Sequence, residues 1–214
     1  MTQLTLVIGN KNYSSWSLRP WLALKQAGIE FSEVRIPLDT PTTRQQILSY
    51  SPSARVPVLR HGTLTIWESL AICEYVAEGF PDAHLWPEDR SARAIARSVS
   101  AEMHAGFQNL RQNMPMDCRG RLPGQGMEAG VQEDIDRITA IWRECRQNVK
   151  VDGDMLFGHF TIADAMFAPV VSRFITYDVK LDSVAAAYVN AIWSLSAMQE
   201  WVVAASAESE VIGR

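Results

Sequence analysis

The sequence predicts an α/β N-terminal domain followed by an all-α C-terminal domain, and three observations support this prediction. In the first eighty residues the apolar pattern alternates between the two-residue period of strands and the longer period of helices. After a proline-containing stretch, the pattern stays helical. The chain has 214 residues, of which 47% are hydrophobic, enough to bury a sizeable core without disulfide bonds.

The first three elements are predicted to form a β-α-β unit. Residues 4–8 are largely aliphatic and end at Gly9, which is typical of a buried strand that leads into a loop. Residues 15–28 carry apolar side chains at helical spacing, with a serine at the start and a glycine at the end. Residues 31–36 alternate between apolar and polar side chains and stop at Pro37, which predicts a second strand.

Four further elements complete the order β-α-β-α-β-β-α. Residues 42–50 predict a short, loosely held helix, because Ile47 and Leu48 are its only aliphatic residues. Residues 56–59 and 64–67 predict two strands joined by a tight turn. Residues 68–79 have helical spacing and end at a glycine, so they predict a third helix.

Only helices are predicted after a linker. Residues 81–89 contain two prolines among polar and aromatic residues, a composition typical of a connection between domains. We therefore expect one domain over residues 1–80 and a second over residues 90–214. The helices expected in the second domain span residues 90–114, 127–148, 162–177, 183–193 and 196–207.

Charge and composition argue against several classes of protein. The net charge of −4 provides no basic field for a nucleic-acid backbone, so we expect no nucleic-acid partner. No apolar run approaches the roughly 20 residues that span a bilayer, so we expect no membrane insertion. Cys73, Cys118 and Cys145 show no C-x-x-C spacing, which argues against a disulfide framework and a zinc site. We expect a cytoplasmic protein without a bound metal.

Several short motifs follow one another at suitable spacing. Residues 14–19 read Ser-Ser-Trp-Ser-Leu-Arg, residues 56–59 read Val-Pro-Val-Leu, and residues 68–72 read Glu-Ser-Leu-Ala-Ile. They resemble the Ser-Ser-x-x-x-Arg signature of the zeta and related serine classes, the cis-proline segment and the glutamate-serine motif of the cytosolic glutathione transferases. Residues 102–111 resemble a bacterial subgroup of that family. This resemblance implies the glutathione transferase fold, with a thioredoxin-like first domain.

A fourth motif extends the resemblance into the second half. Thr161-Ile162-Ala163-Asp164 is similar to the capping box that opens a buried helix in the second domain of this family. In such a box, Thr161 and Asp164 each satisfy an exposed backbone N–H group of the other residue. We expect these two residues to contribute to stability and not to the chemistry.

Ser14 and Ser15 stand between the first strand and the first helix, and the resemblance implies that they are catalytic. The reaction requires glutathione as its thiolate, and a thiol with a pKa near 8.5 is only about 3% ionised at neutral pH. A hydroxyl there can donate to the sulfur, and the positive end of the helix dipole points the same way. We expect Ser14 to contact the sulfur and Ser15 to cap the helix. Without the other motifs, the two serines would simply cap the helix and fill a turn.

The resemblance also assigns residues to glutathione, the expected co-substrate. In the family, a cis bond before the strand proline turns the preceding backbone outward, so Val56 and Pro57 are expected to hold the cysteinyl unit. Arg55 directly precedes these two residues, and its positive charge is expected to face a carboxylate of the ligand. Trp16 belongs to the same expected site. Read alone, a proline that opens an edge strand is ordinary.

Glu68 and Ser69 are expected to bind the opposite end of glutathione. The hydroxyl and N–H groups of Ser69, at a helix N-terminus, suit the γ-glutamyl carboxylate, and Glu68 suits its ammonium group. The local alternative is that Ser69 is an ordinary residue of the first helical turn.

His104, Phe107, Gln108 and Arg111 recur at three- and four-residue intervals on one expected helix. We interpret them as the lining of a pocket for the electrophile. Side chains at this spacing also form helix cores, and a lone histidine on a helix is more often a packed or surface residue than a catalytic one.

The expected function is that of a glutathione transferase, in which the glutathione thiolate attacks a small electrophile. One alternative is a zeta-type maleylacetoacetate isomerase, although the zeta signature has a cysteine where this chain has Trp16. A second is a binding or scaffold protein that kept the fold without turnover. A glutaredoxin-type oxidoreductase is disfavoured because no cysteine stands at the head of the first helix. The resemblance also implies a homodimer.

Overall fold

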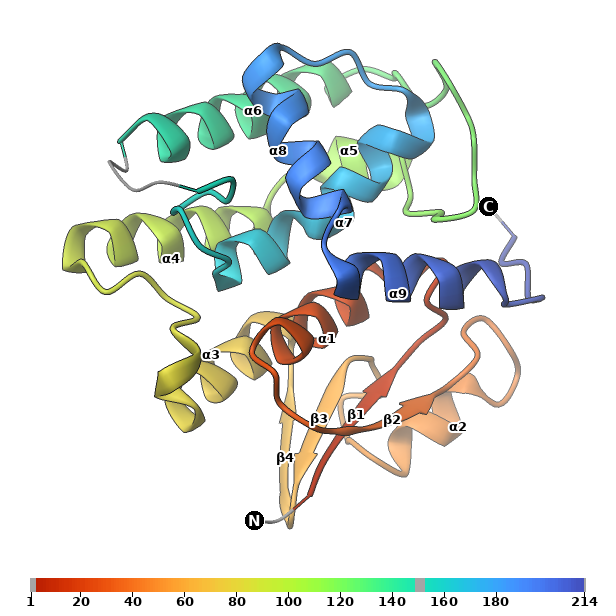
Figure 1. Cartoon of the computed structure of the whole chain (residues 1–214). Helices are drawn as coiled ribbons and strands as arrows, with labels where there is room; N and C mark the ends of the chain where they lie inside the picture. The colour runs from red at the N-terminus through yellow and green to blue at the C-terminus, as the bar shows by residue number, and fades with distance from the viewer. Residues whose placement is uncertain (1–2, 149–152, 214) are drawn as a thin grey trace.

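The first half of the chain is a thioredoxin-like β-α-β-α-β-β-α unit in the computed structural model, which describes residues 3–148 and 153–213 (Figure 1). Its elements are β1 (Leu4–Ile8), α1 (Ser15–Gln26), β2 (Ser32–Arg35), α2 (Thr43–Leu48), β3 (Val58–His61), β4 (Leu64–Trp67) and α3 (Ser69–Gly79). The strands form one mixed sheet in the order β2-β1-β3-β4, in which only β1 and β2 are parallel. The predicted order of elements is confirmed.

The central strand β1 explains how this sheet is covered on both faces. Successive side chains of a strand point to opposite faces. Leu6 and Ile8 belong to the large core that includes α1 and α3, whereas Val7 packs with Ile47 of α2 and Val58 of β3. Ile47 is thus the residue that attaches the short, polar helix α2 to the sheet.

The second half is helical, as predicted, and α7 lies at its centre. Its elements are the 3₁₀ turn η1 (Pro81–Ala83), α4 (Arg90–Ala105), α5 (Gln108–Asn113), α6 (Val131–Asn148), α7 (Ile162–Tyr177), α8 (Ser183–Trp193) and α9 (Ser196–Ser206). Every residue of α7 except Ile175 is buried, and α7 packs against α1, α4 and α8. Among the described residues, no helix combines the length and the apolar composition that a transmembrane span requires.

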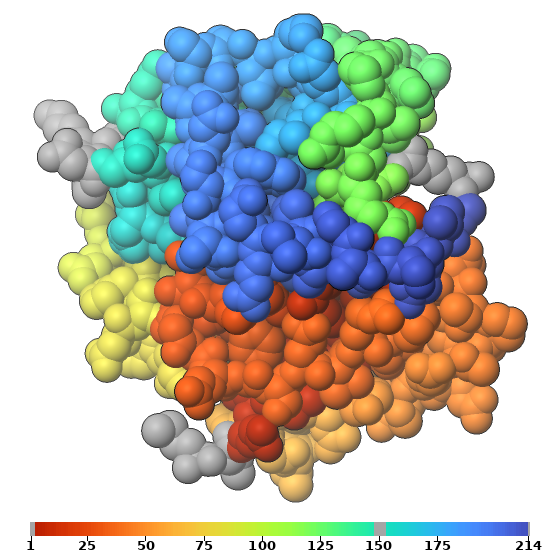
Figure 2. Space-filling view, turned by 45° about the vertical axis from the view of Figure 1, so that its right-hand side comes forward, coloured from red at the N-terminus to blue at the C-terminus, as the bar shows by residue number. Residues whose placement is uncertain are grey.

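The two halves share one hydrophobic core. Trp21 of α1 and Trp201 of α9 meet edge-on, with their ring centroids 5.1 Å apart. The space-filling view shows α9 and the segment after it lying directly against the N-terminal half (Figure 2). The C-terminal segment therefore ends beside the sheet rather than at the far side of the helical half.

The helix predicted over residues 90–114 is interrupted and forms two helices, α4 and α5. Gly106 is extended, and Phe107 adopts a left-handed conformation with φ of 60°. A Cβ atom on Gly106 would lie 2.9 Å from the carbonyl oxygen of Glu102, so the absence of a side chain permits this close approach. The prediction was wrong here because the apolar spacing continues across the break.

Three other predicted boundaries shift by a few residues. The second strand is Ser32–Arg35, shorter than the alternating pattern, and the third strand starts at Val58. Helix α6 begins at Val131, directly after Gly130, whose φ is 83°. Gly130 is favoured in that conformation because it has no side chain.

Candidate active site

A cavity of about 620 Å³ lies where the first half meets α4, and its size is typical of small-ligand sites. Its lining includes all six residues predicted to bind glutathione, together with His104. The lining residues are Trp16, Leu38, Thr43, Ile47, Ser53, Ala54, Arg55, Val56, Pro57, Trp67, Glu68, Ser69 and His104. The fold thus gathers segments that lie up to 88 residues apart in the chain, from position 16 to position 104.

Ser69 presents an unused hydroxyl group at this cavity. It is the first residue of α3 and is fully buried, and its Oγ atom has no hydrogen-bond partner. Buried polar atoms are nearly always bonded, so an unpaired hydroxyl at a cavity wall indicates a position where a ligand acceptor fits. The free N–H groups and positive dipole end of α3 favour an acceptor that carries negative charge.

Glu68 precedes Ser69 at the N-cap position of α3 and has an unusual backbone conformation. Its φ is 69°, in the left-handed region that non-glycine residues rarely adopt. Its carboxylate is half exposed and lies 3.7 Å from Nε2 of His104 on α4. The site therefore has a negative group next to the positive end of a helix.

The segment before β3 forms another part of the cavity wall. The peptide bond between Val56 and Pro57 is cis, as the resemblance implied. Val56 is half-buried, Pro57 is buried and Arg55 is exposed, and all three line the cavity. Arg55 provides this wall with a positive charge.

Ser14 and Ser15 mark the start of α1, but neither lines this cavity. Ser14 occupies the N-cap position and is 5% exposed, while Ser15 is half-buried and is the first residue of the helix. The Ser14 hydroxyl donates to Oγ of Ser17 at 2.7 Å, and that atom accepts the Gly9 N–H at 3.1 Å. The expectation that Ser15 caps α1 is therefore wrong, since Ser14 takes that position. Their immediate neighbour Trp16 does line the cavity.

Trp16 joins the two halves of the molecule at the cavity. The guanidinium groups of Arg19 and Arg111 lie 4.3 and 4.8 Å from the centroid of its ring. The ring also meets His104 edge-on, with centroids 5.3 Å apart. Cation–π contacts to two arginines hold this indole ring in place.

The charge around Trp16 is positive and partly buried. Arg19 is 1% exposed, and its Nε and Nη1 atoms have no hydrogen-bond partner. Burial, followed by repulsion from Arg111 and Arg173, holds the pKa of Arg19 well below its ordinary value. Burial and then the charge of Arg19 also lower the pKa of His104, with Glu68 opposing the shift. His104 is therefore neutral at pH 7.

The other residues predicted for the electrophile pocket lie outside the cavity lining. Phe107 is buried in the core at the break between α4 and α5, and Gln108 is exposed. Arg111 does not line the cavity but contacts two residues that do: its guanidinium lies over the Trp16 ring, and it donates to the carbonyl oxygens of Met103 and His104. The break at Gly106 separates these residues from the helix face that carries His104.

Sequence reasoning missed several groups at this site, among them Arg19, Trp67 and Thr43. Arg19 was seen only as part of a motif, and nothing in the sequence indicated that its guanidinium is buried behind Trp16. Trp67, at the end of β4, is 46% exposed and lines the cavity. Thr43 of α2 lines it as well. The signal for Trp67 was its position directly before the glutamate-serine motif.

The protein's own thiols are unsuited to act as nucleophiles. Cys73, Cys118 and Cys145 are free and buried. Burial raises the pKa of Cys73 to about 12, that of Cys118 to about 11 and that of Cys145 to about 12. Within the described ranges, no group of three or more His, Cys, Asp or Glu side chains is placed to hold a metal ion. Any thiolate chemistry at this cavity requires a thiol from a ligand.

Known proteins resemble the chain in sequence. Residues 13–78 match the family model for the N-terminal domain of glutathione S-transferase. A probable maleylacetoacetate isomerase of Caenorhabditis elegans is 29% identical over 161 residues, which cover 73% of this chain and 72% of that protein. A maleylacetoacetate isomerase of Rattus norvegicus is 38% identical over 100 residues, which cover 45% of each chain.

Solved structures agree with these matches. A glutathione transferase homolog from Burkholderia, with bound glutathione, has a TM-score of 0.71 and 25% sequence identity. The match covers 96% of this chain and 99% of that chain. Over residues 13–78 the chain is thus similar to the N-terminal domain of glutathione S-transferases, and over nearly its whole length it has the fold of a glutathione transferase homolog.

Proposed function

We propose that this protein is a glutathione transferase that stabilises the glutathione thiolate for attack on a small electrophile. One observation carries the proposal: the buried, unpartnered hydroxyl of Ser69 at the start of α3, in the wall of the cavity. Glutathione has a γ-glutamyl carboxylate that would accept from this hydroxyl and from the N–H groups of the first turn. Glu68 is then placed to bind the γ-glutamyl ammonium group.

The remainder of the tripeptide would extend along the segment before β3. The main chain of Val56 offers hydrogen-bonding groups to the cysteinyl unit, in the manner of an added strand. Arg55 provides a charge for the glycine carboxylate. Support for this orientation comes from the shape of the cavity, in which Ser69 and Arg55 both contribute to the lining. The bound glutathione of the Burkholderia homolog is a second argument for this ligand.

The start of α1 would stabilise the thiolate. Lowering the pKa of the thiol by about 2 units raises its ionised fraction at pH 7 from about 3% to about 75%, at a differential stabilisation of about 2.7 kcal/mol. A hydrogen bond from a serine hydroxyl to the anion contributes about 1.5–3 kcal/mol. The helix terminus contributes about 0.3–1 kcal/mol. Ser15 together with the first turn of α1 therefore suffices, as does Ser14 if its hydroxyl turns from Oγ of Ser17 to the sulfur.

Trp16 and His104 would face the electrophile. Both line the cavity, and the positive charges of Arg19 and Arg111 lie behind Trp16. In the reaction, the sulfur electron pair forms a bond to an electrophilic carbon, and the leaving group departs with the pair of the broken bond. Phe107 and Gln108 would support this wall from outside the cavity lining.

A second candidate is glutathione-dependent isomerisation, which the names of the two relatives favour. In that reaction the thiolate adds to a carbon–carbon double bond and leaves again after rotation, so no thioether product accumulates. Trp16 replaces the cysteine of the zeta signature in this chain. Product analysis separates the candidates: a thioether product identifies the transferase, and an isomerised substrate with unchanged glutathione identifies the isomerase.

A glutathione titration followed by a conjugation assay tests the proposal. We expect saturable binding and a conjugation rate above that of free glutathione. A scaffold protein would bind glutathione at most and show no rate. We also propose that the chain forms a two-fold homodimer, as glutathione transferases commonly do. Light scattering of the purified chain will show whether its mass is twice 23.9 kDa.

A further inference from the structure

The loop from β1 into α1, residues 10–13, is held by the C-terminal half of the chain. Trp201 of α9 donates its Nε1–H to the carbonyl oxygen of Lys11 at 2.8 Å. The N–H group of Cys118 donates to the carbonyl oxygen of Asn12 at 3.2 Å. Lys11 and Asn12 are buried, so their main-chain groups require partners within the protein.

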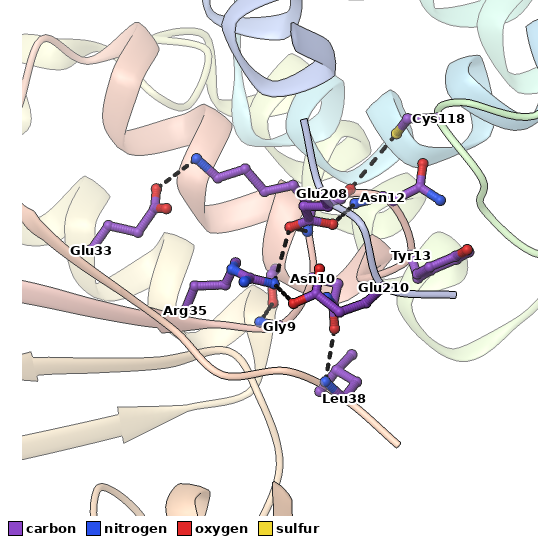
Figure 3. Close-up of polar contacts among 12 residues, drawn as sticks. Gly9, Asn10, Asn12, Tyr13, Glu33, Arg35, Leu38, Cys118, Glu208 and Glu210 are labelled. Atoms are coloured by element: carbon purple, nitrogen blue, oxygen red, sulfur yellow. Dashed lines mark hydrogen bonds and ion pairs between the residues drawn. The ribbon is translucent and has the colours of Figure 1, made fainter. Parts of the chain in front are cut away.

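Glu208 completes this set of partners for the loop. Its Oε1 accepts the Lys11 N–H at 2.7 Å, and its Oε2 accepts the Asn12 N–H at 3.0 Å. The Glu208 side chain is only 7% exposed. One buried carboxylate, 196 residues away in the sequence, thus binds two successive amides of the loop (Figure 3). Hydrogen bonds to a charged acceptor are about twice as strong as those between neutral groups.

The segment that carries Glu208 is itself anchored. Arg119 donates to the carbonyl oxygens of Glu208 and Glu210, the second at 2.8 Å. Arg35 of β2 lies 2.8 Å from the carboxylate of Glu210 and 3.6 Å from that of Glu208. Dashed lines in Figure 3 mark these ion pairs. Glu208 is therefore held from both halves of the molecule, its main chain by Arg119 and its carboxylate by Arg35.

The loop transmits this constraint to the start of α1. The carbonyl oxygen of Asn10 accepts the N–H groups of Tyr13 at 3.2 Å and of Ser14 at 2.8 Å. Lys11 and Asn12 form the bend between these bonded ends. We propose that Glu208 is a positioning residue that, through this loop, holds Ser14, Ser15 and the first turn of α1 in the orientation in which they act on the glutathione sulfur. This inference rests on the proposed function, which assigns the thiolate to the same serines.

Three variants test the proposal. Glu208→Ala removes both acceptors, and Glu208→Gln retains the shape with one carbonyl oxygen. Glu210→Gln is the matched control, because the Glu210 carboxylate pairs with Arg35 and, among the described residues, forms no hydrogen bond or ion pair with residues 10–13. The assay is kcat/KM for the electrophile 1-chloro-2,4-dinitrobenzene at saturating glutathione, against pH from 5.5 to 9, because this quantity reports the ionisation of the bound thiol. Exchange of the Lys11 and Asn12 amide hydrogens is measured on the unliganded proteins.

We expect Glu208→Ala to raise the pKa of the bound thiol by about one unit, which is about a tenfold loss of rate at pH 6. Near pH 9 the loss should be less than twofold, and glutathione affinity should change less than threefold. The thiol pKa of Glu208→Gln should lie between those of the wild type and Glu208→Ala. Glu210→Gln should have the same pKa and pH profile as the wild type. The Lys11 and Asn12 amides should exchange at least tenfold faster in Glu208→Ala.

Two results would overturn this inference while leaving the proposed function intact. One is a kcat/KM of Glu208→Ala that equals that of the wild type at every pH, or that is lower by the same factor at every pH. The other is unchanged amide exchange at Lys11 and Asn12. If Glu208→Ala does not fold, a Glu208→Gln profile identical to that of the wild type has the same meaning. A thiol that keeps its ordinary pKa on the wild-type protein contradicts the proposed function itself, and with it any catalytic role of Glu208.

Discussion

Ser69 shows how one side chain can indicate a ligand. Its hydroxyl has no partner, although it is fully buried, so the protein itself gains no hydrogen bond from it. The sequence placed Ser69 at a helix start, where a serine is ordinary. Only the structure shows that the hydroxyl is unpaired and that the cavity is beside it. The motif therefore suggested the role that we propose for Ser69, and the structure adds a physical argument for it.

Replacing Ser69 by alanine should weaken glutathione binding by about 1.5–3 kcal/mol, the usual loss of a hydrogen bond to a charged group. The unfolding midpoint should stay nearly unchanged, because no internal hydrogen bond is lost. Calorimetric titration and thermal unfolding measure the two quantities. Ser100→Ala is the matched control, since Ser100 is also buried with an unpartnered hydroxyl but does not line the cavity. Equal effects of both variants on affinity would remove Ser69 from the site.

His104 should make stability depend on pH. Burial and the charge of Arg19 lower its pKa in the folded protein, whereas an unfolded histidine titrates near 6.5. The unfolded chain then binds more protons in the window below about pH 6.5. The contribution of neutral His104 to the free energy of unfolding is thus fully present above about pH 6.5. It is lost as the pH falls through the pKa of His104 in the folded protein.

The measurement is the free energy of unfolding by urea between pH 5 and pH 7.5, for the wild type and for His104→Asn. As the pH falls, the free energy of unfolding of the wild type should decrease relative to that of His104→Asn. An NMR titration of His104 in the wild type should give a midpoint below 6.5. A midpoint at or above that value would contradict the assigned environment.

At the scale of the elements, the start of α7 depends on one buried carboxylate. Asp164 accepts from the Thr161 N–H at 2.8 Å, as the capping box predicted, and from the Thr161 hydroxyl at 3.0 Å. It also accepts from the Leu156 N–H at 3.0 Å and the Tyr188 hydroxyl at 3.1 Å, two contacts that the sequence did not indicate. Burial raises the pKa of Asp164, while these donors oppose the shift.

Replacing Asp164 by alanine should cost about 3–5 kcal/mol, because several buried donors lose their acceptor. Asp182 offers the comparison: it caps α8 by accepting two backbone N–H groups, but its side chain is exposed. Asp182→Ala should cost only about 1 kcal/mol. Denaturant unfolding gives both values, and glutathione affinity per folded molecule should not change. Lost affinity at a normal stability would place Asp164 in the site and not in the scaffold.

The elements also show where sequence patterns stop being informative. The elements of the first half were predictable because their apolar periods agree with the turn residues between them. The break between α4 and α5 was not, because it depends on the close approach of Gly106 to the Glu102 carbonyl oxygen. No pattern of apolar residues records such a backbone contact. The prediction that Phe107 and Gln108 line the pocket assumed one continuous helix. Because the helix breaks at Gly106, neither residue lines the cavity.

At the scale of the whole molecule, the site lies at the seam between the two halves. Trp16 contacts Arg111 and His104 across this seam, and Glu208 binds the loop before α1. These pairs are far apart in the sequence, so their contacts depend on how the halves pack. Sequence motifs could therefore identify the positions that we propose to bind glutathione, which lie within one half, but not the residues that meet them from the other.

The central claim is that this protein stabilises a glutathione thiolate at the start of α1, and the pKa of bound glutathione tests it most directly. The thiolate absorbance of the complex near 240 nm, followed between pH 5 and pH 10, gives that pKa. We predict a value about 2 units below the ordinary 8.5, and a return toward 8.5 in Ser14→Ala or Ser15→Ala with unfolding midpoints close to the wild type. A bound thiol that titrates near 8.5 in the wild type, or that keeps its lowered pKa in both variants, would contradict the account.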